Sequence, residues 1–309
     1  MVAPPYRGRF APSPSGRLHL GSLVTALGSF VDARVHGGEW LVRMEDLDPP
    51  REQPGAADEI LRTLEAFGFA WDGPVVYQSR RGELYREALA ELTRQGAAYP
   101  CACSRKEVAD SGRLGIEGPV YAGVCRNGPR PGRDRHAWRV RTHDRPITWV
   151  DRRTGPLSQR LESEVGDFVV LRTDGLFAYQ LAVVVDDAAQ GVDQVVRGAD
   201  LLLSTPRQIH LQGLLRLPTP GYLHLPLVLD AQGRKLSKQS RSQPVDRRQP
   251  LPALLAAWAF LGQPAPPEPP ASVAEFWDWA ECNWDLERLK VRSGNTEDAE
   301  EHGGHRAQT

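Results

Sequence analysis

The chain has 309 residues, and its acidic and basic side chains nearly cancel to a net charge of −1. A hydrophobic content of 40% with 25% charged residues is typical of a soluble globular protein and excludes a largely disordered one. The sequence shows neither an apolar stretch long enough to span a bilayer nor the apolar core of a signal peptide. Four cysteines do not indicate a disulfide scaffold, so we expect a cytoplasmic protein with one large and one small domain.

The N-terminal stretch predicts a strand, a turn and a helix. Residues 8–11 should form the strand, which ends at Pro12, and the helix should begin near Leu20. The free N–H groups and positive dipole at the start of a helix favour polyphosphate binding, and His19 can donate a ring N–H to a phosphate oxygen. An ordinary Pro/Gly turn with a solvated histidine is an equally good reading of this stretch taken alone.

The next segments alternate between strand and helix. Residues 39–48 read as a strand that runs into an acidic turn at Glu45, where a carboxylate can bind an ammonium group, hold a metal or cap the next helix. Because strands and amphipathic helices alternate, we expect an α/β fold with a mostly parallel, doubly wound sheet. The other elements predicted in this region are helices at 56–67 and 82–95 and a strand at 75–77.

Three cysteines lie close together in a glycine-rich segment, at Cys101, Cys103 and Cys125. Thiolates on one short loop are typical ligands of a tetrahedral zinc site. The spacing leaves the fourth ligand open between Tyr121, His136 and a water, and three buried free thiols are the alternative. The fourth cysteine, Cys282, lies in a predicted helix, and we expect it in the core.

Residues 126–160 contain ten arginines together with Trp138 and Trp149. Such a stretch can contact a phosphate backbone and stack a base, or it can be a solvated face, and the two readings are equally supported. Residues 137–142 alternate like a half-buried strand.

The second half of the chain predicts a hairpin at 167–179 and a buried strand at 192–198. Arg197 at the carboxyl end of that strand suits a bidentate grip on a carboxylate, and Tyr179 can add a hydroxyl, although a surface arginine and a core tyrosine are the plainer readings. Asp200 is expected to cap a helix that continues to Leu214. A strand at 225–230 and helices at 252–261, 273–284 and 286–291 follow, and residues 293–309 should be disordered.

The loop Lys235-Leu-Ser-Lys-Gln239 contains two of the only four lysines in the chain. A compact ammonium group suits a transferring phosphoryl or adenylyl centre, whereas a solvated basic loop is the alternative.

Two of these stretches together resemble class I aminoacyl-tRNA synthetases. Residues 12–22, with His19-Leu-Gly-Ser22, are similar to the HIGH motif, and residues 235–239 are similar to the KMSKS loop. The sequence RFAPSP before the first motif is closest to glutamyl-tRNA synthetases, and the resemblance covers residues 7 to about 262. Ser22, Leu236 and Gln239 depart from the family pattern, but His19, Gly21 and Lys238 keep it.

The resemblance implies a role for each matching residue. His19 and Lys238 would be catalytic, and ATP would bind with Mg²⁺. The residues expected at ATP are Pro12, His19, Gly21, Ser22, Lys235, Ser237 and Lys238, and those expected at glutamate are Arg9, Ser13, Glu45, Tyr179 and Arg197.

One branch of that family, the glutamyl-Q tRNA(Asp) synthetases, resembles the chain most. Its Cys-x-Cys and Tyr-x-x-x-Cys pattern implies one structural zinc ion on Cys101, Cys103, Tyr121 and Cys125. About seventy residues follow Lys238, too few for an anticodon-binding part, so we expect none. The branch activates L-glutamate with ATP and transfers it to queuosine in the anticodon loop of tRNA(Asp). We expect a monomer without membrane contact.

The expected domains are two catalytic halves at 1–98 and 136–240, a zinc-binding insertion at 99–135, a helical region at 241–291 and a tail at 292–309. Three other functions remain open: a glutamyl ligase with another acceptor, a non-catalytic nucleotide- or RNA-binding module, and one chain of a split synthetase.

Overall fold

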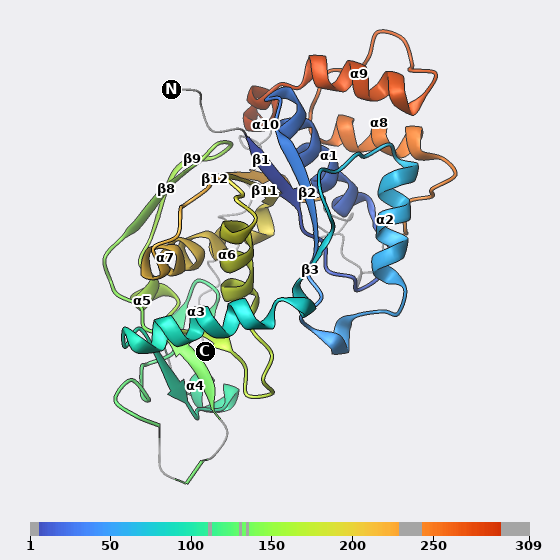
Figure 1. The fold of residues 1–309 in the computed structure, drawn as a ribbon. Coiled ribbons are helices and arrows are strands. Elements are labelled where there is room, and N and C mark those ends of the chain that lie inside the picture. Colours follow the sequence, from blue (N-terminus) through green and yellow to red (C-terminus); the bar gives the residue numbers. More distant parts are fainter. Residues whose placement is uncertain (1–5, 111–112, 130–131, 134–135, 229–242, 292–309) are drawn as a thin grey trace, which may run out of the picture.

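A computed structural model describes residues 6–110, 113–129, 132–133, 136–228 and 243–291 (Figure 1). The lysine-containing loop 235–239 and the expected tail 293–309 lie outside the described residues. In the described part of the chain, no helix is long and apolar enough to cross a membrane.

A mostly parallel sheet forms the centre of the molecule, as the alternation of elements predicted. Strand β1 is parallel to β2, β2 to β3, and β11 to β12. The backbone N of Asp193 donates to the carbonyl O of Arg7 over 3.1 Å, so β11 lies beside β1 (Figure 1). The strands are β1 (Arg7–Phe10), β2 (Glu39–Met44), β3 (Val76–Tyr77), β11 (Gln194–Gly198) and β12 (Gly221–Leu225).

Helices cover both faces of this sheet. On one face, buried apolar residues form a continuous core whose centre holds Phe30, Trp40, Phe69 and Trp277. A second core lies among the helices of the other side (Figure 1). The first group is α1 (Leu20–Val35), α2 (Ala56–Ala66), α8 (Pro250–Phe260), α9 (Val273–Asn283) and α10 (Leu286–Val291), and the second is α3 (Gly82–Arg94), α6 (Tyr179–Ala189) and α7 (Thr205–Leu215).

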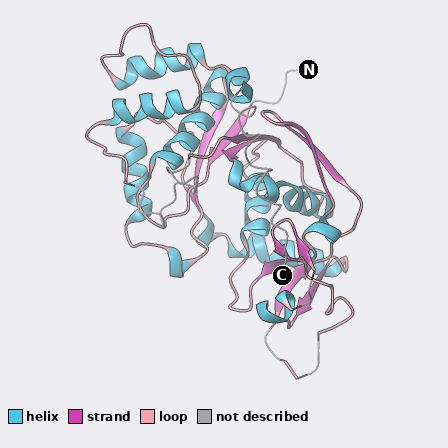
Figure 2. Ribbon diagram, turned by 180° about the vertical axis from the view of Figure 1, so that it is seen from behind, coloured by secondary structure: helices cyan, strands magenta, loops and turns pink. Residues whose placement is uncertain are grey.

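Smaller antiparallel elements extend from this framework (Figure 2). Strand β7 pairs on its two sides with β4 and β10, and the hairpin of β8 and β9 joins β12 through the pair Tyr222–Asp151. These strands are β4 (Ala98–Cys101), β5 (Leu114–Gly115), β6 (Gly118–Pro119), β7 (Ala137–Val140), β8 (Ile147–Asp151), β9 (Gly155–Gln159) and β10 (Phe168–Leu171). Short helical segments are α4 (Arg105–Ala109), α5 (Leu161–Glu164), η1 (Pro49–Arg51), η2 (Gln78–Arg80) and η3 (Ala199–Ser204).

Four sequence-based expectations need correction. The hairpin predicted at 167–179 forms, with an antiparallel bridge between Leu171 and Phe177, but its second arm is too short to be a regular strand, because Tyr179 already begins α6. The strand predicted at 225–230 lies earlier, as β12, and ends at Leu225, since Pro226 has no N–H for a sheet; residues 229 and 230 are outside the described part of the chain. Asp200 lies within η3, and the regular helix begins only at Thr205, with Pro206 in its first turn. Cys282 is exposed, because it lies on the face of α9 opposite Ala280 and Phe276.

Candidate active site

A cavity of about 270 Å³ lies where β1 and β11 end and α1 begins. Every predicted ATP- or glutamate-binding residue within the described part of the chain lines it: Arg9, Pro12, Ser13, His19, Gly21, Ser22, Glu45, Tyr179 and Arg197. The remaining candidates, Lys235, Ser237 and Lys238, fall in the loop outside the described residues. Residues far apart in sequence therefore meet at one site, at the carboxyl ends of parallel strands.

His19 is the N-cap of α1. Its Nδ1 accepts the backbone N–H of Ser22 over 3.3 Å, and its Nε2 lies 3.2 Å from the Ser22 hydroxyl. Because Nδ1 is an acceptor, the neutral ring carries its proton on Nε2. The site thus combines the N–H groups at the start of a helix with an imidazole N–H donor, an arrangement suited to phosphate.

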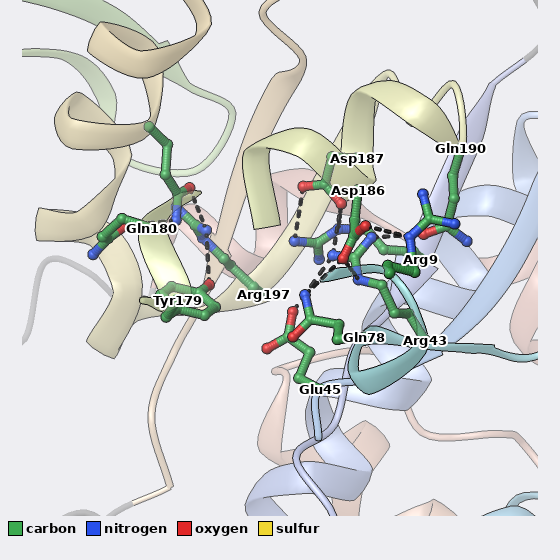
Figure 3. A network of polar contacts seen from close by, with 12 residues as sticks. Arg9, Arg43, Glu45, Gln78, Tyr179, Gln180, Asp186, Asp187, Gln190 and Arg197 are labelled. Atoms are coloured by element: carbon green, nitrogen blue, oxygen red, sulfur yellow. Dashed lines mark hydrogen bonds and ion pairs between the residues drawn. The ribbon is translucent and has the colours of Figure 1, made fainter. Parts of the chain in front are cut away.

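A buried network of charges supports Arg9 (Figure 3). Nε and Nη2 of Arg9 donate to the two carboxylate oxygens of Asp187 over 3.1 and 3.3 Å, and Nη2 of Arg43 lies 2.8 Å from the same carboxylate. Burial alone would raise the pKa of Asp187, but Arg9 and Arg43 reverse the effect and hold that pKa below its ordinary value. The aspartate stays ionised and fixes the plane of the Arg9 guanidinium.

Glu45 lies between this network and the opposite wall of the cavity (Figure 3). Its backbone N donates to the carbonyl O of Pro12 over 3.0 Å, which fixes the acidic turn against the first motif. Burial raises the pKa of the Glu45 carboxyl, although Arg43 at 3.4 Å and Arg9 oppose the shift. A largely buried carboxylate of this kind is stabilised by a cationic ligand such as an ammonium group.

Arg197 forms the opposite wall and is held mainly from behind. Nη1 donates to Gln208 Oε1 over 2.7 Å, Nη2 to Thr205 Oγ1 over 2.9 Å, and Nε to His224 Nε2 over 3.1 Å. The contacts to cavity-lining residues are longer: 3.4 Å from Nη1 to the Tyr179 hydroxyl and 3.3 Å from Nη2 to the Leu201 carbonyl. A ligand carboxylate can therefore replace the weaker contacts while the stronger ones keep the guanidinium in place.

Sequence reasoning missed the supporting residues Arg43, Asp187 and His224. Each is charged or titratable within an apolar segment: Arg43 in β2, Asp187 in α6 and His224 in β12. A single charged or titratable residue within an apolar segment could have indicated such a supporting role, because a buried charge requires a partner.

The predicted zinc ligands also lie together. The Sγ atoms of Cys101, Cys103 and Cys125 all lie within 4.8 Å of one another, with 3.6 Å between Cys103 and Cys125. The Tyr121 hydroxyl lies 3.3 Å from Cys101 Sγ and 3.7 Å from Cys103 Sγ. A disulfide needs about 2.05 Å between its sulfurs, whereas tetrahedral zinc places them about 3.8 Å apart, so the residues fit a zinc ion better.

Several arginines of the segment 126–160 are engaged within the protein. Arg126 binds Asp167 and Glu162, Arg133 binds Glu107, and Arg152 binds Asp32. These arginines stabilise the fold, so the segment as a whole offers less cationic surface to RNA than its composition indicated.

The family model for the catalytic domain of class I tRNA synthetases (E and Q) matches residues 6–250. Glutamyl-Q tRNA(Asp) synthetase of Aromatoleum aromaticum is 59% identical over 286 residues, which cover 92% of this chain and 90% of the relative. The chain belongs to the glutamyl-Q tRNA(Asp) synthetase family. The corresponding protein of Chromobacterium violaceum is 57% identical over 284 residues and supports the same assignment, with 92% of this chain and 95% of the relative covered.

A solved structure shows the same fold. The glutamate tRNA ligase of Elizabethkingia meningosepticum, in complex with its amino acid, superimposes with a TM-score of 0.73 at 24% identity. The match covers 93% of this chain and 66% of that protein. The class I synthetase architecture expected from the two motifs is therefore confirmed.

Proposed function

We propose that this protein activates L-glutamate with ATP and transfers the glutamyl group to queuosine at the wobble position of tRNA(Asp). The observation that carries the proposal is one cavity with two buried guanidinium groups, Arg9 and Arg197, and one largely buried carboxylate, Glu45. These charges complement the two carboxylates and one ammonium of glutamate. The names of the most similar relatives supply the acceptor.

In the first step, an α-carboxylate oxygen of glutamate attacks the α-phosphorus of ATP. The bond from that phosphorus to the β-phosphate oxygen breaks, giving glutamyl-adenylate and pyrophosphate. His19 and the N-terminus of α1, with Gly21 and Ser22, stabilise the negative charge of the transferring phosphate, and Pro12 shapes the turn before them. Lys238, with Lys235 and Ser237, supplies further contacts from the loop outside the described residues, and Mg²⁺ accompanies ATP.

The amino acid is held by the other side of the cavity. Arg9 and Arg197 bind its carboxylates, Glu45 binds its ammonium, and Tyr179 and Ser13 add hydroxyl groups. In the second step, a hydroxyl oxygen of queuosine attacks the carbonyl carbon of the adenylate. An ester forms, AMP leaves, and the hydroxyl proton is released to solvent.

The cysteine cluster is proposed to hold one structural zinc ion on Cys101, Cys103, Cys125 and Tyr121. Nε of Arg139 lies 3.3 Å from Cys101 Sγ, and its guanidinium lies over the Tyr121 ring at 4.1 Å. This positive charge favours thiolate ligands, as zinc requires. We further propose that the segment around the cluster, within residues 99–135, is an insertion between two catalytic halves.

The first test is transfer of labelled glutamate with ATP to tRNA(Asp), with and without queuosine. Label on the queuosine-containing tRNA alone, resistant to removal of the 3′-adenosine, is the expected result. Adenylate formation without any labelled tRNA would indicate a glutamyl ligase with another acceptor. Absence of glutamate-dependent ATP–pyrophosphate exchange would contradict the enzyme function, unless a co-purifying partner chain restored it.

The role of the loop is tested separately. Lys238→Ala should abolish glutamate-dependent pyrophosphate exchange while the protein keeps its thermal unfolding temperature. Retained exchange would remove Lys238 from the chemistry.

A further inference from the structure

A second cavity, of about 570 Å³, adjoins the first. The two share seven lining residues, among them Ser13, Glu45 and Tyr179. The second cavity therefore opens directly onto the place where glutamate is proposed to bind. Its own wall comes from the acidic turn after β2 and from the segment before α6, and includes Leu47, Asp48, Arg51, Glu52, Gln78, Arg172, Phe177 and Ala178.

Of the two carboxylates that belong only to this wall, Asp48 is paired with arginines of the protein and Glu52, within the described part of the chain, is not. Asp48 forms ion pairs with both Arg51 and Arg172, which lower the pKa of its carboxyl although its partial burial acts in the other direction. Arg172 forms a second ion pair, with Asp174, over 2.5 Å. These two guanidinium groups are therefore already occupied by protein carboxylates.

Glu52 differs from Asp48. Its Oε1 atom is buried and accepts no hydrogen bond within the described part of the chain. Burial, with the nearby charges of Asp46 and Asp48, raises the pKa of the Glu52 carboxyl, although a hydrogen bond from the backbone N–H of Asp48 to this carboxylate opposes the shift, so only Oε1 is left without a partner. An unpartnered buried oxygen is unfavourable in the free protein and is relieved by a ligand that donates a hydrogen bond.

The position of Glu52 is fixed relative to the active site. The backbone N of Glu52 donates to the carbonyl O of Pro49 over 3.2 Å. The backbone N of Gln53 donates to the carbonyl O of Pro14 over 3.0 Å. The second bond ties the acidic turn to the turn that lines the first cavity. A ligand bound at Glu52 is thus held in a defined place beside the glutamyl group.

The occupant should be cationic and partly apolar. A nucleotide triphosphate is disfavoured by the acidic wall, and the phosphate-binding groups at the start of α1 line only the first cavity. Leu47 and Phe177 offer apolar contact to a heterocycle, and Glu52 offers an acceptor to an N–H donor. Queuosine has these features, since a secondary amine links its 7-deazaguanine ring to the hydroxylated cyclopentene.

We propose that the second cavity is the acceptor subsite and that Glu52 binds the protonated secondary amine of the queuosine base. This inference rests on the proposed function and adds to it a residue that selects the acceptor. With the amine held at Glu52, the cyclopentene hydroxyls lie toward the shared wall of the two cavities, where the adenylate carbonyl is exposed to attack. A guanosine at the wobble position lacks the amine and leaves Oε1 without a partner.

The test uses Glu52→Gln, which keeps the shape of the side chain and removes its charge. The measured quantities are glutamate-dependent pyrophosphate exchange, which does not need the acceptor, and transfer to queuosine-containing tRNA(Asp). We expect unchanged exchange and a fall in kcat/KM for the tRNA of about tenfold to a hundredfold, the usual effect of losing a hydrogen bond to a charged group. The matched control is Glu65→Gln, an exposed residue of α2, which should leave both activities unchanged.

A small-molecule arm separates amine recognition from other effects. 7-Aminomethyl-7-deazaguanine carries the amine but no hydroxyl acceptor, and 7-deazaguanine lacks both. The first should inhibit transfer by the wild-type protein at about tenfold lower concentration than the second, and this difference should vanish in Glu52→Gln.

Several outcomes would overturn the inference. Equal transfer by Glu52→Gln and wild type, or equal inhibition by the two bases, would exclude Glu52 from acceptor binding. Loss of exchange together with transfer in Glu52→Gln would place the residue in glutamate activation or folding instead. Failure of the wild-type protein itself to catalyse exchange or to label queuosine-containing tRNA would contradict the proposed function, not this subsite alone.

Discussion

Nε of Arg197 donates a hydrogen bond to Nε2 of His224 over 3.1 Å. The other ring nitrogen of His224, Nδ1, lies 2.7 Å from Asp151 Oδ2, so the imidazole is neutral with its proton on Nδ1. Burial lowers the pKa of His224, and the nearby charge of Arg197 adds to this effect while Asp151 opposes it. The histidine and the aspartate together orient an arginine that lines the cavity and is proposed to bind glutamate, so we expect His224 to act as a positioning residue.

His224→Leu should raise the KM for glutamate by about tenfold to a hundredfold in pyrophosphate exchange and change kcat less, because Arg197 loses one of the contacts that orient it. His224→Gln keeps an acceptor oxygen and should recover a large part of the loss. The exposed His143 provides the control, and His143→Gln should behave as wild type. Equal effects of the leucine and glutamine variants on both constants would argue for a purely structural role.

Glutamate binding should depend on pH through Glu45. Because burial raises the pKa of this carboxyl, it becomes protonated at a higher pH than the ordinary glutamate value of about 4.3. Only the ionised form attracts the ammonium of the substrate, so the KM for glutamate should rise as the pH falls through this raised pKa. The pH profile of KM in pyrophosphate exchange measures the effect.

The matched variant is Glu45→Gln, which cannot ionise. Its KM for glutamate should be high and nearly independent of pH over the same range. If the wild type and this variant gave parallel profiles, the titrating group would be another residue.

The sequence was most informative where one segment carries its own pattern. The helix predicted from residue 20 and the parallel strands follow from periodicity, whereas the nine cavity-lining residues follow from the resemblance to glutamyl-tRNA synthetases. Side-chain partners were not predictable in the same way. Arg9 and Asp187 are 178 positions apart, and their contact exists only because α6 packs beside β1. The second cavity likewise depends on how the acidic turn meets the segment before α6, which no local pattern encodes.

The cysteine cluster predicts one tightly bound zinc ion per chain. Cys125→Ser should lose the metal, and because metal binding stabilises the folded state, the thermal unfolding temperature should fall by about 5–10 °C. Cys282→Ser is the control, since Cys282 is exposed and remote from the cluster, and it should retain both metal and stability. Elemental analysis and thermal unfolding of the purified variants measure the two effects. A wild-type protein that is as stable without metal as with it would contradict the assignment.

Arg43 makes the buried charge network a determinant of stability as well as of binding. Its side chain is fully buried and lies 2.8 Å from Asp187, 3.4 Å from Glu45 and 3.9 Å from Asp186. Arg43→Met leaves these carboxylates without their shared cation, so the free energy of unfolding should fall by about 3–5 kcal/mol. Urea unfolding of the variant measures the loss.

The double variant Arg43→Met/Asp187→Asn tests the reason for this loss. Removing the aspartate charge relieves the buried imbalance, so the double variant should be more stable than Arg43→Met alone. Arg34→Met gives a reference for losing an arginine whose ion pair with Asp72, 2.8 Å away, is partly exposed, and it should cost about 1 kcal/mol or less. If the losses in free energy of unfolding of the two single variants, Arg43→Met and Asp187→Asn, simply added up in the double variant, burial of the arginine stem would account for the effect and charge compensation would not.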